Sequence, residues 1–397
     1  MRLGIVLPRY GADVVGGTEH WLQTLAEHLV AERGFEVEVF TTCATSAVTW
    51  ADELPPGSTE LHGVTVHRHR SVSGRDPAYG ALDPLIRRDP GGVPDHVARR
   101  FVELVGPVCP DVLDHAEASA CDLIAVTPYL FWPAVHGVPR LGRRVVFHGA
   151  AHDEAELHLR ILRPVYAAAG GFAYNSFAER SLVERVFPVG QLPGCVVGNT
   201  VVERHGDPVA ARQALGIGEA PFLLCVGRVE RTKGAHVLAE MFLEYKRRHP
   251  GPLKLVFIGP ENERVERDPD LVVAGRQPEA VKWGALRAAE VFVTPSAFES
   301  FSLVVLESWL AGRPVLVNGR CAATVEHCRR GHGGLWFDSY GTFEAALDRL
   351  LGDDDLRADL GRRGEVYARA NFAWPPLLDR YESLCERVLA RRSLAHN

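Results

Sequence analysis

The feature that most limits the possible folds is a series of short apolar runs, rich in Val, Ile, Leu and Phe, with helix-like segments between them. This alternation predicts βα units and parallel sheets that are buried on both faces. In the first half of the chain the runs lie at residues 3–7, 35–41, 64–67, 123–127, 144–147, 171–174 and 195–197. In the second half they lie at 222–226, 253–258, 271–274, 291–294 and 314–317. We therefore expect two α/β domains, each built on its own sheet.

The boundary between the two domains is predicted in the polar segment 199–208, which ends in an Asp-Pro pair. A chain of 397 residues suits two domains, since one domain usually holds ~100–200 residues. We expect a first domain at 1–202 and a second at 203–374. Within the remaining segment, 375–397, apolar residues recur at helical spacing and predict a last helix at about 375–392. Such a helix needs a surface to pack on.

The composition excludes several classes of protein. A net charge of −6 gives no basic surface of the kind that nucleic-acid-binding proteins use. No apolar run approaches the ~20 residues that span a bilayer, and residues 1–6 lead directly into a predicted strand, so we expect a cytoplasmic protein without a membrane span. The eight cysteines form no Cys-x-x-Cys pair, which favours free buried thiols over a metal site.

Two glycines, Gly16 and Gly17, follow the first predicted strand, where the next helix is expected to begin near Thr18. In a parallel sheet this turn presents backbone amides to ligands, and glycine lets the backbone approach a phosphate closely. Glycine is also common in such turns for its backbone freedom alone. These residues by themselves leave both interpretations open.

A basic turn follows the strand predicted at 222–226. It is bounded by Gly227 and Gly234 and contains Arg228 and Lys233. Isolated basic residues are usually solvated surface side chains. Here a lysine, a scarce residue in this chain, lies close to an arginine at the carboxyl end of a buried strand, which favours a diphosphate-binding site.

Two glutamates, Glu299 and Glu307, follow the strand predicted at 291–294. Ser302 is predicted as the N-cap of the next helix, which places Glu307 about one and a half turns into that helix. The free amides around Phe301 to Leu303 would face an anion, which the helix dipole also favours. Carboxylates accept paired hydroxyls well, so Glu307 suits a ribose diol and Glu299 a sugar hydroxyl.

Two other interpretations of these acids are possible. In one, Glu299 is a turn residue and Glu307 a solvated helix position, but the helix is largely apolar and a buried carboxylate needs a partner. In the other, the acids act together as in a glycoside hydrolase. The accompanying basic turn favours nucleotide-sugar binding over both.

At these residues the sequence resembles the retaining glycosyltransferases of family four, over essentially the whole chain. The resemblance is carried by the Gly16-Gly17 turn, by Gly227-Arg228 with Lys233-Gly234, and by the two glutamates inside the segment 295–307. It implies the GT-B fold: two Rossmann-like domains that face each other across a cleft, with a C-terminal helix that crosses back to the N-terminal domain. The first domain would then bind the acceptor, and the second the nucleotide-sugar donor.

The resemblance also implies roles for single residues. Arg228 and Lys233 would hold the donor diphosphate, Glu307 the ribose and Glu299 the transferred sugar. His148, which ends the strand predicted at 144–147, resembles the family's histidine at the reaction centre, although His152 follows closely and is the alternative. The donor-binding set that we predict is Gly16, Gly17, Arg228, Lys233, Glu299, Ser300, Phe301, Ser302, Leu303 and Glu307.

We therefore expect an enzyme that transfers a sugar from a UDP-, GDP- or dTDP-sugar to a hydroxyl, with retention of anomeric configuration and without an essential metal. The acceptor would be a sugar, a lipid-linked or a natural-product hydroxyl, and peripheral membrane contact is compatible with this role. The tracts 52–57 and 75–92, dense in Pro, Gly, Arg and Asp, are candidates for acceptor contacts or are simple surface insertions. Alternative functions are a nucleotide-sugar epimerase, a sugar phosphorylase, or a non-catalytic protein that binds nucleotide sugars.

Overall fold

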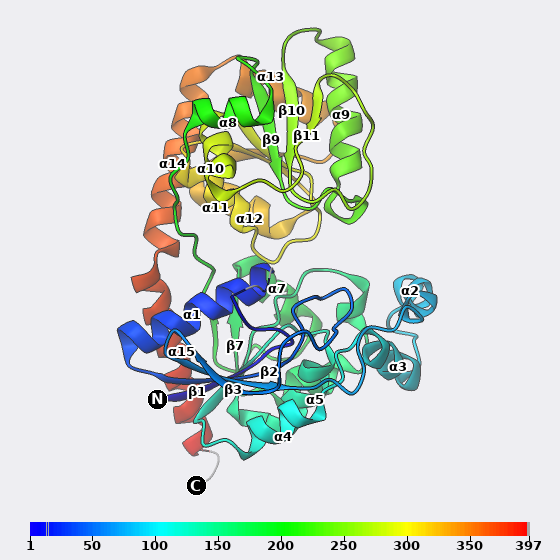
Figure 1. Ribbon diagram of the computed structural model, residues 1–397, viewed down its shortest axis with the longest axis vertical. Coiled ribbons are helices and arrows are strands. Elements are labelled where there is room, and N and C mark those ends of the chain that lie inside the picture. Colours follow the sequence, from blue (N-terminus) through cyan, green and yellow to red (C-terminus); the bar gives the residue numbers. More distant parts are fainter. Residues whose placement is uncertain (13, 15, 395–397) are drawn as a thin grey trace. The chain divides into compact units, whose positions relative to one another are not determined.

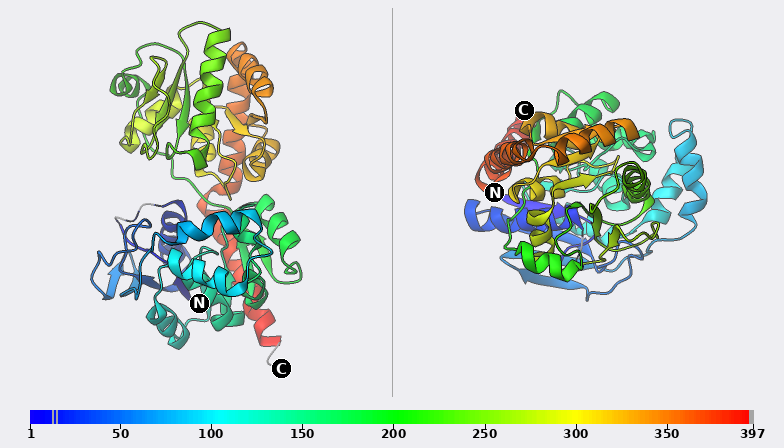
Figure 2. Two further views of the ribbon diagram at one scale, coloured as in Figure 1. Left: turned by 90° about the vertical axis from the view of Figure 1, so that its right-hand side faces the viewer. Right: turned by 90° about the horizontal axis from the view of Figure 1, so that it is seen from above.

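The computed structural model describes residues 1–12, 14 and 16–394 (Figure 1). The chain divides into two compact units. The first comprises Met1–Asn199 together with Trp374–Asn397, and the second comprises Thr200–Ala373. Each unit is a sheet with helices on both faces, as the alternation of apolar runs and helical segments predicts (Figure 2).

The first unit holds an eight-stranded sheet in the order β3-β4-β2-β1-β5-β6-β7-β8. Its pairs are parallel except for the antiparallel edge pair β3–β4. The strands are β1 (Arg2–Val6), β2 (Glu36–Thr42), β3 (Gly57–Leu61), β4 (Val64–His69), β5 (Leu123–Val126), β6 (Val145–Phe147), β7 (Gly171–Tyr174) and β8 (Gly194–Val196). The α-helices are α1 (Gly17–Arg33), α2 (Tyr79–Arg88), α3 (Asp95–Val105), α4 (Pro110–Ala118), α5 (Trp132–Leu141), α6 (Leu162–Ala168), α7 (Phe177–Val186) and α15 (Trp374–Leu394).

Two apolar cores cover the two faces of this sheet. Leu3 and Ile5 of β1 pack with α1 and α15, whereas Val6 packs with α3 to α6 on the other face. Successive strand residues point to opposite faces, so a strand covered on both sides must be apolar throughout. The runs that predicted the strands are therefore a direct result of double-sided burial.

The second unit holds a six-stranded parallel sheet in the order β11-β10-β9-β12-β13-β14. The strands are β9 (Phe222–Val226), β10 (Lys254–Ile258), β11 (Leu271–Val273), β12 (Val291–Thr294), β13 (Val315–Asn318) and β14 (Gly334–Phe337). The α-helices are α8 (Pro208–Leu215), α9 (Ala235–Arg248), α10 (Glu279–Ala288), α11 (Leu303–Leu310), α12 (Ala322–Gly331), α13 (Tyr340–Leu351) and α14 (Asp354–Phe372). From β9 the chain builds outward through β10 to β11 and then returns to the other side of β9 as β12. The strand order thus reverses between β9 and β12.

The last helix, α15, belongs to the first unit and packs on α1, β7 and β8 (Figure 1). Its buried residues are those at the predicted helical spacing: Leu377, Leu378, Tyr381, Leu384, Cys385 and Val388. Arg33 of α1 also pairs with Asp379 at 2.5 Å between Nη2 and Oδ1. The prediction that a C-terminal helix crosses back to the first domain is confirmed.

Two strands and one helix have no counterpart among the predicted elements. Strand β3 lies at the sheet edge with four of its five residues exposed, so it lacks an apolar run. Strand β14 has four residues, begins with a glycine and follows the segment 331–333, which contains two more glycines. The tract 75–92, expected as a surface insertion, contains α2 despite Pro84 within that helix. Weak or conflicting local signals explain all three differences.

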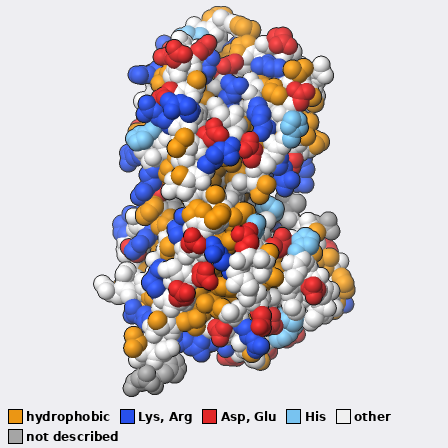
Figure 3. Space-filling model, turned by 90° about the vertical axis from the view of Figure 1, so that its left-hand side faces the viewer, with side chains coloured by type: hydrophobic (Ala, Val, Ile, Leu, Met, Phe, Trp, Pro, Cys, Tyr) orange, Lys and Arg blue, Asp and Glu red, His pale blue; other side chains and the backbone are white. Residues whose placement is uncertain are grey.

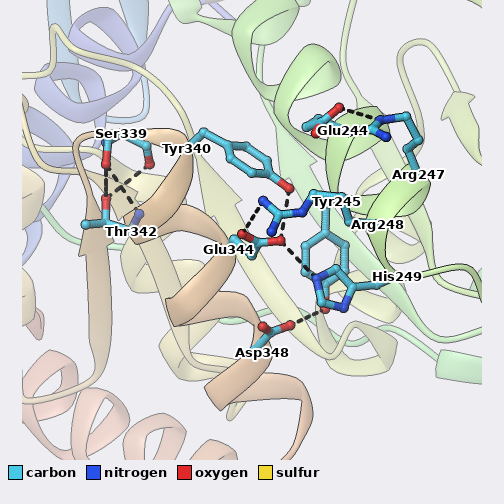
Figure 4. Close-up of polar contacts among 10 residues, drawn as sticks. All are labelled: Glu244, Tyr245, Arg247, Arg248, His249, Ser339, Tyr340, Thr342, Glu344 and Asp348. Atoms are coloured by element: carbon cyan, nitrogen blue, oxygen red, sulfur yellow. Dashed lines mark hydrogen bonds and ion pairs between the residues drawn. The ribbon is translucent and has the colours of Figure 1, made fainter.

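Helix α9 is tied to α13 by a network of polar side chains (Figure 4). Glu344 of α13 accepts hydrogen bonds from Arg248 at 2.8 Å and Tyr340 at 3.2 Å, and its Oε1 lies 2.9 Å from Nε2 of His249. Its side chain is 15% exposed. A largely buried acceptor with several donors stabilises a structure more than a solvated ion pair does.

We expect Glu344→Ala to lower the free energy of unfolding of the second unit by about 1–2 kcal/mol, because it leaves these donors without their acceptor. Urea unfolding, followed by hydrogen exchange of β9 and β10, measures this loss. Glu244→Ala is the matched control, since Glu244 pairs with the exposed Arg247 within α9. Equal losses in the two variants would contradict the assigned role of Glu344.

The outer faces of the units are charged. Figure 3 shows one side of the molecule, where acidic and basic side chains are interspersed over the second unit rather than gathered by sign. Ion pairs within α14 include Arg363 with Asp359 and Arg369 with Glu365. Within the described part of the chain, no helix combines the length and the apolar character needed to cross a membrane.

Candidate nucleotide-sugar site

The candidate site lies where the strand order of the second sheet reverses, at the carboxyl ends of β9 and β12. Open α/β sheets bind ligands at such points, where the helices that follow the two strands lie on opposite faces of the sheet. The two loops contact each other closely. Gly234 has φ 75°, and a Cβ added to it would lie 2.7 Å from the carbonyl oxygen of Pro295. Only glycine fits this turn, in backbone angle and in space.

An ion pair joins the two loops. Nζ of Lys233, after β9, lies 2.8 Å from Oε1 of Glu299, after β12. The side chains are 30% and 22% exposed, so both remain accessible to a ligand. The structure therefore brings together two residues that the sequence assigns to one site although they are far apart along the chain.

Arg228 lies in the same turn and is held by a residue that the sequence analysis did not assign, Glu230. Arg228 Nη1 lies 3.1 Å from Glu230 Oε1, while Glu230 also accepts hydrogen bonds from Thr232 at 2.6 Å and Asn262 at 2.8 Å. Burial alone would raise the pKa of Glu230, but these two hydrogen bonds and Arg228 lower it below its usual value. Glu230 is thus a charged anchor that shapes the basic turn, and Arg228 remains 56% exposed.

Helix α11 begins at Leu303, as predicted, but Ser302 does not cap it with its side chain. Ser302 has φ 75° and ψ 80°, in the left-handed region. A capping hydroxyl needs an extended backbone at this position to reach the amides of the first turn. The predicted capping bond is therefore wrong, and the buried Ser302 Oγ has no partner among the residues that the structure describes.

Phe301 fills the core beneath this loop. Its side chain is 2% exposed and packs edge-on against His327 and Phe372, with ring centroids 4.7 and 5.1 Å away. A buried aromatic ring is not available to a polar ligand. Any contact of Phe301 with a donor would have to come from its backbone.

Glu307 is nearly buried on α11 and has the partner that burial requires. Its Oε1 lies 2.9 Å from Nζ of Lys282 on α10, and the two side chains are 13% and 14% exposed. Burial raises the pKa of Glu307, and Lys282 opposes that shift. The sequence analysis predicted that Glu307 needs a partner but did not identify Lys282, which is distant in sequence.

In the first unit, Gly16 and Gly17 lie at the start of α1, after β1. A Cβ on Gly16 would lie 2.1 Å from Oε2 of Glu19, which is itself paired with Arg9 at 3.0 Å from Nε. A side chain at position 16 would therefore require the ends of the Glu19 and Arg9 side chains to move. Nothing lies within 4 Å of a Cβ added to Gly17, so the backbone there is open.

His148 directly follows β6, as predicted, and its side chain is 4% exposed. Nε2 lies 3.1 Å from Oη of Tyr381 on α15, and the ring centroid lies 5.4 Å from that of Trp21. Burial lowers the pKa of His148 to about 3, so the imidazole is neutral at ordinary pH. His152, the alternative, is 29% exposed with Nδ1 at 3.4 Å from Oε2 of Glu154.

Comparisons with known proteins show the family to which the chain belongs. The family described as glycosyl transferases group 1 matches residues 220–353, which include the loops of the candidate site. D-inositol 3-phosphate glycosyltransferase of Nocardia farcinica is 34% identical over 409 residues, covering 91% of this chain and 82% of the relative. The chain belongs to the group 1 glycosyltransferases. A second relative of the same name, from Acidothermus cellulolyticus, is 28% identical and covers 97% of this glycosyltransferase and 88% of its own length.

Solved structures show the same fold. Sucrose-phosphate synthase from Thermosynechococcus elongatus superposes on this glycosyltransferase with a TM-score of 0.70 at 18% identity, covering 98% of this chain and 99% of that one. Anabaena HepE in complex with UDP and glucose gives 0.66 at 15% identity, covering 98% and 100%. The expected GT-B fold is thus confirmed. The chain is an enzyme of a retaining family that transfers sugar from a nucleotide-sugar donor.

Proposed function

We propose that the loops after β9 and β12 bind the donor, with Arg228 and Lys233 on its diphosphate. The observation that carries this proposal is the Lys233–Glu299 pair, at 2.8 Å, where the strand order reverses. Each side chain is partly exposed, so a bound donor can replace the ion pair. Its diphosphate would then bind the Lys233 ammonium, and a sugar hydroxyl would donate a hydrogen bond to the Glu299 carboxylate. One ion pair thereby prepares both halves of the donor site.

The remaining donor contacts follow from the same loops. Glu299 accepts a hydrogen bond from a hydroxyl of the transferred sugar, and Glu307 accepts hydrogen bonds from the ribose hydroxyls. The backbone from Ser300 to Leu303 lies at the amino end of α11, where free amides and the helix dipole favour the phosphates. In the first unit, Gly16 and Gly17 leave a backbone that can approach an anionic ligand.

The chemistry that we propose needs little from the protein beyond charge and position. As the bond between the anomeric carbon and the phosphate oxygen breaks, negative charge gathers on the diphosphate, where Arg228 and Lys233 stabilise it. The departing phosphate takes the proton of the acceptor hydroxyl on the same face. His148 acts at the reaction centre as a neutral hydrogen-bonding group, since its buried imidazole does not carry a proton at ordinary pH.

We propose further that no bound metal is required, because two side-chain cations already balance the charge of the diphosphate. UDP is the first donor nucleotide to test, because HepE, which shares the fold, was solved with UDP and glucose. The acceptor class proposed for the first test is a phosphorylated polyol, because the curated relatives are named for D-inositol 3-phosphate. Sugar, lipid-linked and natural-product hydroxyls form the second acceptor panel.

The test combines UDP-, GDP- and dTDP-glucose with these acceptors, with and without EDTA, and identifies products by NMR. We expect a new glycosidic bond of retained configuration, at a rate that chelation does not change. An epimerised nucleotide sugar, or a sugar 1-phosphate formed with inorganic phosphate, would instead assign an epimerase or a phosphorylase. A protein that binds the nucleotide but shows neither sugar transfer nor slow hydrolysis of the donor would be non-catalytic.

A further inference from the structure

The ion pair between Lys282 and Glu307 gives the two oxygens of the Glu307 carboxylate different environments. Oε1 is held at 2.9 Å by Nζ of Lys282, whereas Oε2 is buried and has no partner in the described part of the chain. Lys282 is itself fixed from a second side, by Oε2 of Glu279 at 3.0 Å. A carboxylate with one oxygen pinned and the other lacking a donor is prepared to accept hydroxyl groups.

Burial makes this arrangement depend on Lys282. The charged groups around Glu307 are Lys282 and Glu279 from α10 and Arg204 from the segment before α8. Burial and Glu279 both disfavour the charged carboxylate, and Lys282, at contact distance, is the main opposing charge. Without Lys282, the cation left among the described groups around Glu307 would be Arg204, which acts on the carboxylate less strongly than Lys282 does.

We propose that Lys282 is the positioning residue that keeps Glu307 charged and oriented as the acceptor for the donor's ribose hydroxyls. This inference rests on the proposed role of Glu307 in the donor site. A ribose offers hydroxyls at both C2′ and C3′, whereas a 2′-deoxyribose offers only the second. The Lys282–Glu307 pair therefore selects UDP- or GDP-sugars over dTDP-sugars.

The experiment measures binding of UDP and 2′-deoxy-UDP, and of GDP and 2′-deoxy-GDP, by calorimetry on the full chain. For the wild type we expect whichever of UDP and GDP binds more tightly to bind about tenfold or more tightly than its own 2′-deoxy form. Lys282→Met should weaken the ribonucleotide about tenfold and the deoxy form much less.

Two further variants separate this role from a structural one. Lys282→Arg should retain ribose selectivity, since it keeps the charge. Lys254→Met is the matched control, because it removes a lysine that pairs with Asp270 rather than with Glu307. It should bind both ribose and deoxyribose ligands as the wild type does. In steady-state kinetics Lys282→Met should raise KM for the donor with little change in kcat, as expected for a contact remote from the breaking bond.

A double variant covers the case in which Lys282→Met does not fold. Lys282→Met with Glu307→Gln replaces the buried pair by neutral side chains of similar size. If Lys282 acts through Glu307, the double variant binds nucleotides as Glu307→Gln alone does. An additional loss in the double variant, or equal losses on ribose and deoxyribose ligands, would overturn the inference. A wild type that binds no nucleotide at all would instead refute the proposed function.

Discussion

Replacing Lys233 with alanine is expected to lower the rate of sugar transfer by about 10²–10³ while the fold stays intact. The ammonium of Lys233 stabilises charge that develops on the leaving diphosphate, so its loss acts on the transition state more than on donor binding. Its side chain is 30% exposed and its ion-pair partner is Glu299 of the same site. The measurement is kcat/KM for the donor together with the thermal midpoint. Arg228→Ala is expected to act in the same way.

Lys254→Ala provides a matched control. Lys254 also pairs with a carboxylate, that of Asp270 at 3.3 Å, but it is the first residue of β10 and so lies at the amino ends of the parallel strands, away from the candidate site at their carboxyl ends. Its loss should leave the rate of transfer unchanged. Near-normal turnover in Lys233→Ala, or equal losses in the two variants, would remove the proposed diphosphate site.

Acid is expected to destabilise the second unit through His327, and His327→Phe should abolish most of that effect. The His327 side chain is 1% exposed and packs against Phe301, Trp309 and Tyr367. Burial lowers its pKa to about 4, so between about pH 6.5 and 4 the unfolded chain binds a proton that the folded unit does not. Stability is therefore fully present above pH 6.5 and declines as the pH falls, by about 3 kcal/mol at pH 4.

Urea unfolding at pH 7 and pH 4.5, followed by hydrogen exchange of β9 and β12, measures this slope. In His327→Phe the aromatic surroundings accept the new ring, and the two pH values should give more similar free energies of unfolding. His205→Gln, which removes an exposed imidazole from the same unit, should keep the slope of the wild type. A slope that is unchanged in His327→Phe would show that other groups govern the acid response.

The sequence predicted the elements that are buried on both faces. Strands β9 and β12 have the predicted bounds because each is a closed run of apolar residues between polar turns. Strand β3 carries no such run, because it lies at the edge of the sheet, where its backbone pairs on one side only and its exposed side chains do not enter the core. The apolar runs therefore predict strands that are buried on both faces, and they do not predict exposed strands.

Some residues of the candidate site could be predicted from the sequence, and others could not. Lys233 and Glu299 follow neighbouring strands of one sheet, so topology alone brings their loops together once the strand order is known. Lys282 and Glu230 could not be assigned, because the first depends on how α10 packs against α11 and the second on how a turn closes over Asn262. Partners of buried charges are set by tertiary packing, which no local spacing encodes.

The position of α15 has a consequence for synthesis on the ribosome. Tyr381 and its apolar neighbours on α15 complete a core that also contains side chains of α1 and of strands β1, β2, β4, β5, β6 and β7, all of which precede the second unit in the sequence. Translation therefore finishes the second unit before the first has all of its residues. Until α15 has emerged, the nascent first unit carries the apolar face that Leu377, Tyr381 and Leu384 cover in the folded protein.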